Sequence, residues 1–330
     1  MPGFSTQTMS IYSQKPLKLD RLNTYPLASR PSKVTIRDFA KVSKPRAGVR
    51  AWLGSLPRIL AAESLRAVVA AMEKARAAGK PIIWGIGGHV IKCGLAPVLI
   101  DLMRRGYLTA VAMNGAAMIH DFEIGLVGAT SEDVPTVLGS GKFGMAEETG
   151  RVVNETIAAG DREGLGIGEA MGRFLARSRQ ARFRRFSFLA EAYRLRIPAM
   201  VHVAMGTDIT HNHPAVDPRA VGSASHRDFL LLASLVKELH HGGVYLNVGS
   251  AVVLPEVFLK CLSLAANLHR APRGITTVNM DFIQHYRPTQ NVLVRPTAGT
   301  GKGRDRSHGY MLIGHHELMV PLLAAALKGR

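Results

Sequence analysis

A glycine-punctuated stretch over residues 81–121 constrains the fold of this chain more than any other feature. An apolar run at residues 81–84 breaks into glycines, and the apolar spacing of residues 90–103 is that of a helix. A second apolar run, residues 108–113, ends in the small residues 114–117, where another helix begins. This order predicts a βαβα unit whose two strands lie parallel and side by side.

The turns after these two strands are candidates for ligand binding. Small residues let backbone N–H groups approach a ligand, and helix N-termini beside them favour an anionic group such as a pyrophosphate. The first turn contains Gly85, Gly87 and Gly88 and therefore reads GxGG, whereas dinucleotide-binding turns read GxGxxG. Most glycine turns in α/β proteins bind nothing, so these turns alone predict the fold and not the ligand.

Three further apolar segments, residues 197–205, 243–248 and 275–279, are predicted to be buried strands. Each ends in small or polar residues, and helical patterns separate the segments. This pattern predicts an α/β fold with a doubly wound, mostly parallel, Rossmann-like sheet and helices on both faces. The strand ends should meet at one edge of the sheet, where ligands bind.

The domain organisation follows from composition. The chain has 330 residues, of which 47% are hydrophobic, and this is enough for a large core. Residues 1–32 are polar and lack periodicity, so they are predicted to form an extended arm, and residues 33–330 a single α/β domain. A helical insertion is expected at about residues 145–195. The irregular segment 281–308 is long for a compact domain, which suggests a functional lid.

Cysteine content and hydropathy indicate a cytoplasmic protein. The two cysteines, Cys93 and Cys261, both lie in apolar helical patterns, so a disulfide framework is not expected. The N-terminus lacks the basic-then-apolar pattern of a signal peptide, and the longest apolar run, residues 320–327, is too short to span a bilayer. No membrane partner is therefore expected.

The formal net charge of +18 allows two interpretations. Many of the basic residues lie between Arg173 and Arg185, and they could attract a nucleic acid or an acidic protein. Apolar residues such as Phe174 and Leu175 interleave with these arginines in the way that core-facing positions would. The favoured interpretation is a solvated basic face, and a nucleic-acid partner is not expected.

Residues 80–328 resemble the deoxyhypusine synthase and homospermidine synthase family. Residues 84–121 match, without a gap, the family's glycine turn, its Thr-Ser-Asn loop and its later Thr-Ala-Gly-Gly run. Thr207 and Asp208 match a Thr-Asp pair that follows a buried strand in the family. Three later blocks keep the family's order and spacing: residues 249–256, 278–281 and 315–323.

The resemblance implies a deoxyhypusine synthase-like NAD-binding fold and an NAD-dependent transferase. Family members use tightly bound NAD to oxidise spermidine, carry the aminobutyl group as an imine on a lysine, and pass it to an acceptor amine. The implied partners are a small-molecule amine or related substrate, a protein lysine as one class of acceptor, and further copies of the chain in a homotetramer. The residues implied to line the cofactor are Gly87, Gly88, His89, Asn114, Gly115, Ala116, Asp208, Gly249, Met280, Asp281, His315 and His316.

The substrate-facing positions depart from the family pattern. Family members hold the ammonium groups of the polyamine with carboxylates, because a buried cation needs anionic partners. Here Ile119 and His120 replace a Glu-Glu pair, and His213 replaces an aspartate. The basic loop 287–302 stands where the family has an acidic stretch, so the substrate is expected to differ from spermidine.

Four residues are the candidate catalytic groups: Lys302, His120, His213 and Glu256. Lys302 falls within one residue of the position expected for the imine-forming lysine. Nearby cations lower a lysine pKa, and Arg304 and Arg306 are close in sequence. A solvated loop lysine is the alternative interpretation of Lys302, and both stay open.

Two other classes of function compete with the transferase. The first is a metal-dependent hydrolase that uses His120, His211 and His213, since His211 and His213 are spaced to point to the same side of an extended segment. The second is a basic, non-enzymatic binding protein that has kept the fold. The transferase interpretation assigns no metal ligand.

Overall fold

The structure of the chain, a computed structural model, describes residues 13–14, 17–44 and 46–328. Residues 1–12 and 15–16 of the predicted arm lie outside this description. The chain divides into two compact units, Met1–Asp38 and Phe39–Arg330. The described part of the first unit has two short 3-10 turns, η1 (Leu27–Ser29) and η2 (Ile36–Asp38), and its side chains are mostly exposed. The second unit contains the sheet.

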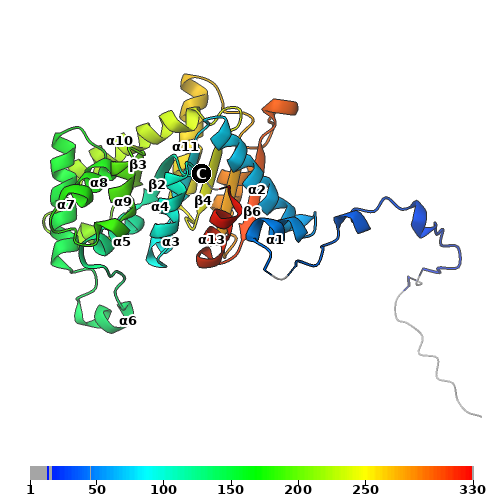
Figure 1. The fold of residues 1–330 in the computed structure, drawn as a ribbon, viewed down its shortest axis with the longest axis horizontal. Helices are drawn as coiled ribbons and strands as arrows, with labels where there is room; N and C mark the ends of the chain where they lie inside the picture. The colour runs from blue at the N-terminus through cyan, green and yellow to red at the C-terminus, as the bar shows by residue number, and fades with distance from the viewer. Residues whose placement is uncertain (1–12, 15–16, 45, 329–330) are drawn as a thin grey trace, which may run out of the picture. The chain divides into compact units, whose positions relative to one another are not determined.

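Six parallel strands form one sheet in the order β3-β2-β1-β4-β5-β6 (Figure 1). Their bounds are β1 Ile82–Ile86, β2 Ala110–Asn114, β3 Ala199–His202, β4 Val244–Val248, β5 Thr276–Asp281 and β6 His308–Ile313. The chain runs outward from β1 to β3 and then returns to the other side of β1 with β4. The connections therefore reverse direction between β1 and β4, which is the point where open α/β sheets bind ligands.

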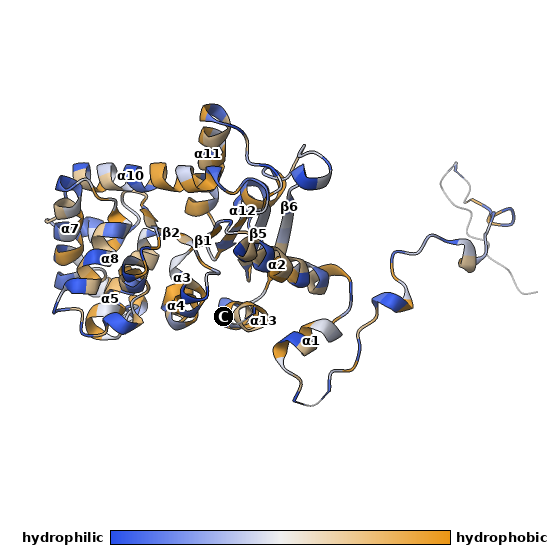
Figure 2. Ribbon diagram, turned by 45° about the horizontal axis from the view of Figure 1, so that its top comes forward, coloured by the Kyte–Doolittle hydropathy of each residue, from blue (hydrophilic) through white to orange (hydrophobic). Residues whose placement is uncertain are grey.

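Helices cover both faces of the sheet, as the sequence predicts. Trp84 and Val111 point into an apolar layer formed with α2 (Leu60–Ala77), α4 (Ala96–Arg104), α5 (Gly115–Val127) and α13 (His316–Ala326). Ile83 and Tyr245 point into the opposite layer, formed with α10 (Pro218–Lys237) and α11 (Val253–Leu268). Neighbouring strand residues face opposite sides, so both faces of the strands are apolar. Figure 2 shows apolar and polar residues alternating along helices such as α10, as expected of helices with one solvated face.

The βαβα unit is confirmed, with Ile83 of β1 opposite Ala110 of the parallel strand β2. The buried Trp84 indole donates a hydrogen bond of 2.9 Å to the Tyr107 carbonyl just before β2. The helix expected over residues 90–103 is in fact two helices, α3 (Gly88–Lys92) and α4. Gly94, with φ of +83°, turns the chain between them, and a proline in the first turn of α4 starts the second helix.

Two helices, α1 (Val49–Ser55) and α2, precede β1. Pro57 lies between them, where a continuous helix would lose a backbone hydrogen bond.

The segment between β2 and β3 is helical throughout most of its length. After α5 it contains α6 (Val134–Val137), η3 (Leu138–Ser140), α7 (Glu147–Arg162), α8 (Ile167–Arg177), η4 (Arg184–Phe186) and α9 (Phe188–Arg194). In Figure 1 the green helices α7, α8 and α9 gather at the β3 side of the sheet. The fully buried Asp121 carboxylate of α5 fixes this group, because it accepts hydrogen bonds from the Ser187 hydroxyl and from the N–H groups of Phe188 and Leu189.

The segment expected to be irregular, residues 281–308, is largely structured. It contains α12 (Tyr286–Pro288), a π-helical turn η6 (Thr289–Val294) and η7 (Gly303–Asp305), and it leads into the edge strand β6. Val292 and Leu293 are buried in the second apolar layer, so this part of the predicted lid is core. The sequence of β6 gives little sign of a strand, because Leu312 is its one fully buried residue.

None of the helices in the described part of the chain has the length and apolarity that a bilayer-spanning segment needs.

Candidate functional site

The turns after β1 and β4 meet at the switch point of the sheet. The Gly87 N–H donates a hydrogen bond of 2.9 Å to the carbonyl of Val248, the last residue of β4. A Cβ atom on Gly87 would lie 2.0 Å from the Gly249 carbonyl oxygen, so only glycine fits there. Gly249 has φ of +68°, a left-handed conformation that also favours glycine. The two turns therefore meet backbone against backbone, and the candidate ligand crevice is the carboxyl edge of the sheet around them.

Buried asparagines hold the turn after β4 in place. The Asn247 side-chain amide donates a hydrogen bond of 2.9 Å to the Ser250 carbonyl. It donates another, of 2.7 Å, to the side-chain oxygen Oδ1 of Asn279 on β5. The Ser250 hydroxyl accepts the Leu254 N–H at the start of α11. These bonds tie the turn to β5 and to α11, so the crevice is rigid on this side.

The ends of β2 and β3 meet through Asn114 and Asp208. The Asn114 side chain caps α5 by accepting the Ala117 N–H at 3.0 Å. A Cβ atom on Gly115 would lie 1.9 Å from Asp208 Oδ2, so the Asp208 carboxylate rests against the first residue of α5. Burial raises the pKa of Asp208, and His211 partly offsets this effect. Asp208 is thus a half-buried carboxylate beside a helix N-terminus.

His316 closes the crevice from the side of β5 and β6. It is fully buried, and its Nε2 lies 3.3 Å from the Met280 carbonyl and 3.6 Å from Asp281 Oδ1. Its Cε1 lies 2.8 Å from the position that a Cβ on Gly249 would take. Its Nδ1 has no hydrogen-bond partner among the described residues. Burial is the main cause of its lowered pKa, which favours the neutral ring, and a neutral ring leaves this nitrogen able to accept a hydrogen bond.

Aromatic rings form the rim of the crevice. The exposed ring of Phe282 is 5.7 Å from the His89 ring and 5.5 Å from the His315 ring, with which it stacks at 13°. The His89 ring also lies 5.4 Å from the His316 ring. Such a rim suits a planar heterocycle or a cation.

The twelve residues implied to line a cofactor all follow or end a strand at the carboxyl edge of the sheet. Gly87, Gly88 and His89 follow β1, while Met280 and Asp281 end β5. A Cβ on Gly88 would lie 2.9 Å from the Ala116 Cβ, so the starts of α3 and α5 touch. The structure therefore brings these residues together at one edge, although they come from all six strands.

Lys302 does not join this group, whereas burial lowers the pKa of His120 and this histidine is close enough to His89 for the charge of His89 to lower it further. Lys302 is exposed and lies before β6, at the amino edge of the sheet. The neighbouring Asp305 fixes that position, because its carbonyl accepts the Gly274 N–H ahead of β5 and its carboxylate lies 2.7 Å from His241 Nε2 ahead of β4. Lys302 therefore lies at the edge opposite the cofactor-lining residues of its own chain, because the loop returns to that edge.

Glu256 lies on the first turn of α11 and is occupied by surface interactions. Its carboxylate accepts the Asn291 amide at 2.9 Å and forms ion pairs with Lys260 and Arg287. The Lys260 hydrogen bond is the largest cause of the lowered pKa of Glu256. This carboxylate holds the π-helical turn against α11 instead of facing the crevice.

His120 lies on α5 and contacts the loop after that helix, and His213 packs against α7. The Nδ1 atom of His120 lies 2.7 Å from the Thr130 hydroxyl, and burial lowers its pKa while Glu123 raises it. The His213 ring packs on Gly150, and its Nε2 lies 3.2 Å from Glu147. Both histidines therefore have local hydrogen-bond partners.

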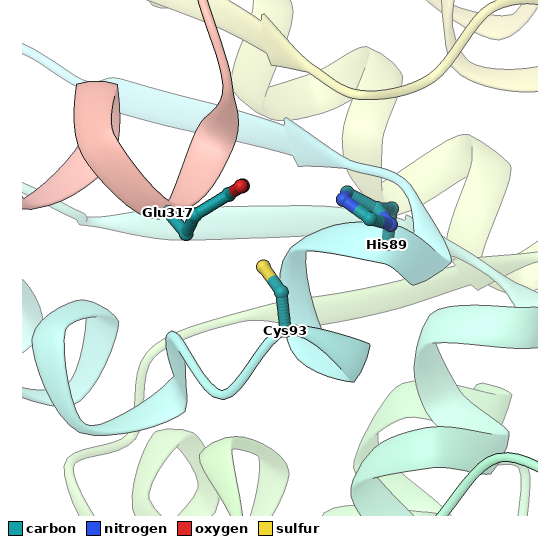
Figure 3. A group of neighbouring side chains, drawn as sticks. All are labelled: His89, Cys93 and Glu317. Atoms are coloured by element: carbon teal, nitrogen blue, oxygen red, sulfur yellow. The ribbon is translucent and has the colours of Figure 1, made fainter.

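The proposed metal site of His120, His211 and His213 does not form. Among the described residues, they do not constitute a group with ligand atoms close enough for one ion. His211 is not available as a ligand through Nδ1, because this atom already accepts hydrogen bonds from the N–H groups of Gly206 and Asp208. The group that does meet this criterion is His89, Cys93 and Glu317 (Figure 3).

A cleft of about 840 Å³ lies between α5 and α7, away from the switch point. Its polar groups largely satisfy one another, since Glu123 accepts hydrogen bonds from both Thr130 and Thr149. The backbone crevice, with its unpartnered His316 nitrogen, is therefore the stronger candidate for a ligand site.

Sequence reasoning missed Cys93, Asn247, Phe282 and Glu317 as residues of this region. The sequence predicts Cys93 to lie in an apolar helical pattern and assigns Glu317 no role. The one signal in the sequence is the spacing of His89 and Cys93, which are four residues apart and so lie on one face of a helix. Burial, followed by the charge of Glu317, raises the pKa of the Cys93 thiol.

No protein-family profile matches the chain, and no curated protein matches it significantly. A candidate deoxyhypusine synthase from Entamoeba histolytica has a similar structure, with a TM-score of 0.51 and 10% identity over 86% of this chain and 93% of that chain. A candidate LOR/SDH protein from Methanococcus maripaludis S2 gives a TM-score of 0.50 and 16% identity over 87% and 74% of the two chains. These likenesses show the fold alone.

ArgZ, a cyanobacterial arginine dihydrolase, is also similar, with a TM-score of 0.48 and 19% identity over 83% of this chain. The chain spans only 33% of the length of ArgZ.

Proposed function

We propose that this chain is an NAD-dependent enzyme of the deoxyhypusine synthase type that acts on an amine through an imine. The observation that carries the proposal is the close backbone approach of Gly87 and Gly249 at the switch point of the sheet. A dinucleotide needs this arrangement, because its pyrophosphate must approach backbone N–H groups closely. The fold likeness to the candidate deoxyhypusine synthase supports the same proposal.

The residues at the crevice fit NAD in three ways. The first turn of α5 offers backbone N–H groups to an anion, because the Asn114 cap accepts only that of Ala117. The half-buried Asp208 carboxylate can accept hydrogen bonds from ribose hydroxyls. The unpartnered His316 nitrogen can accept one from an amide or hydroxyl of the ligand.

An amine substrate suits the charges at this edge. Asp208, Asp281 and Glu317 place carboxylates near the crevice in a chain whose formal net charge is +18. A carboxylate attracts an ammonium group, and the exposed Phe282 ring adds a cation–π surface. The substrate is proposed to differ from spermidine, because Ile119 and His120 stand in place of the family's paired glutamates.

When bound, NAD would supply an acceptor for the hydride lost from the carbon next to the amine nitrogen. The imidazole of His315, exposed at the rim, can accept the proton that the nitrogen releases, so the amine becomes an imine. Lys302 has no part in this step within its own chain, and the homotetramer remains part of the proposal.

The proposal is tested by incubating the protein with NAD and a panel of monoamines, diamines and amino acids with terminal amines. We expect one class of amine to produce reduced nicotinamide, detected by its absorbance. Asp208→Asn should lower kcat/KM at least about tenfold, whereas Asp133→Asn, which changes an exposed aspartate remote from the crevice, should have no effect. NAD binding without reduction by any amine would contradict the amine chemistry and leave the cofactor assignment standing.

A further inference from the structure

Three potential metal ligands converge between α3 and α13. One nitrogen of His89, the Cys93 thiol and one carboxylate oxygen of Glu317 all lie within 4.8 Å of one another. Figure 3 shows His89 on α3, Cys93 at the C-terminal end of that helix and Glu317 at the start of α13, with the three side chains extending into the space between the helices. Two rigid elements thus present three donor atoms to one point.

The donor atoms are available. Within the described part of the chain, the His89 ring nitrogens and the Glu317 carboxylate make no hydrogen bond, and the Cys93 thiol makes only a long contact of 3.6 Å to the Val90 carbonyl. Glu317 also lies 3.8 Å from His315 Nδ1, a contact too long for a hydrogen bond. No strong interaction has to be broken for these atoms to turn toward an ion.

We propose that His89, Cys93 and Glu317 bind a divalent transition-metal ion of the zinc class. Imidazole, thiolate and carboxylate are the three ligand types that Zn²⁺ takes in proteins, and the thiolate selects against Mg²⁺ and Ca²⁺. The spacing of His89 and Cys93 gives both ligands to one helix face, as paired histidines do in helical zinc sites.

Three protein ligands leave one tetrahedral position open, as in catalytic zinc sites. His89 and Glu317 are exposed, so a water molecule or an oxygen atom of a small ligand can reach that position. The site lies beside the crevice, because the His89 ring is 5.4 Å from the His316 ring. A metal here would bind and polarise an oxygen of a molecule held at the rim.

The site is tested with Co²⁺, which occupies zinc sites and absorbs light. The full-length, metal-free protein is titrated with Co²⁺ and its ultraviolet and visible spectrum recorded. We expect one ion per chain, visible bands of tetrahedral intensity and a thiolate-to-cobalt charge-transfer band, with Zn²⁺ displacing the cobalt. Cys93→Ser should remove the charge-transfer band, and His89→Ala and Glu317→Gln should each weaken binding at least about tenfold.

Matched variants distinguish cobalt binding at this site from cobalt binding elsewhere on the chain. Cys261→Ala changes the other cysteine, which is buried in the second apolar layer, and Glu148→Gln changes an exposed glutamate elsewhere. Both should leave the cobalt spectrum unchanged. The absence of stoichiometric cobalt binding, or a charge-transfer band that persists in Cys93→Ser, would overturn the proposal. Asp208→Asn should weaken NAD and spare cobalt, so failure of the cofactor proposal is distinguishable from failure of the metal site.

Discussion

The carbonyl oxygen of Gly249 lies 2.0 Å from the point where a Cβ atom on Gly87 would stand. The two glycines belong to the turns after β1 and β4, neighbouring strands at which the chain reverses its direction across the sheet. Backbone meets backbone here because neither Gly87 nor Gly249 has a side chain. The crevice that results is the feature on which the proposed cofactor site depends.

Gly87→Ala should therefore be destabilising and should weaken NAD binding. The new methyl group would force the two turns apart, at a cost of about 1–3 kcal/mol in the free energy of unfolding. Urea unfolding measures this cost, and Gly222→Ala is the control. Gly222 lies in α10 with open space around it, so alanine there should stabilise the chain by about 0.5–1 kcal/mol. Equal effects of the two substitutions would contradict the tight approach of the turns.

Asp121→Asn should lower the free energy of unfolding by about 1–3 kcal/mol. The buried carboxylate accepts three hydrogen bonds at the start of α9, and an amide nitrogen cannot accept the bonds on its side. Asp101→Asn is the matched control, because it removes an exposed ion pair with Arg105 worth at most about 1 kcal/mol. A loss no larger than that of the control would show that Asp121 does not secure α9.

Asp228 should make stability depend on pH. Its carboxylate accepts the Val201 N–H at 2.8 Å and the Gly168 N–H at 3.0 Å, and burial raises its pKa from 3.8 to about 7. Between these values the folded state holds a proton that the unfolded state has lost. This contribution to the free energy of unfolding is therefore fully present below pH 3.8 and is lost as the pH rises through about 7.

The measurement is the difference in unfolding free energy between the wild type and Asp228→Asn from about pH 8 down to about pH 5. The difference should move in favour of the wild type as the pH falls. Subtracting the two free energies of unfolding cancels the contributions of groups that both proteins share. One such group is His202, whose lowered pKa of about 4 destabilises the folded state as the pH falls, because the unfolded state takes up that proton first. A difference that stays constant with pH would rule out the raised pKa of Asp228.

Lys302→Ala should leave NAD affinity within about twofold of the wild type. The lysine is exposed at the amino edge of the sheet, whereas the crevice is at the carboxyl edge. Calorimetric titration of both proteins makes the comparison. A loss of tenfold or more would mean that Lys302 reaches a cofactor site, for example that of a neighbouring subunit.

The sequence predicts the parallel sheet well, because strands β1, β2, β4 and β5 are short apolar runs that end in small or polar residues. Such runs are typical of strands that are buried on both faces of a sheet. It fails at β6, which has one fully buried residue and resembles a loop. It also merges α3 and α4, which Gly94 divides, since apolar spacing continues across the break.

The site is less predictable than the sheet. Cys93 and Glu317 lie far apart in the sequence and meet only because α13 returns to the edge where α3 begins. Conversely, Lys302 resembles a family residue by its spacing, but the chain places it before β6 and hence at the opposite edge. The spacing of a residue from a family motif does not show at which end of a strand that residue lies.

The central claim is that the crevice between β1 and β4 binds NAD, and calorimetric titration of the purified protein with NAD tests it most directly. We expect saturable binding with a Kd of about 1 μM or below, weakened at least tenfold, or about 1.4 kcal/mol, by Asp208→Ala. The absence of binding heat, in a protein whose absorbance spectrum shows no co-purified nicotinamide, would contradict the account.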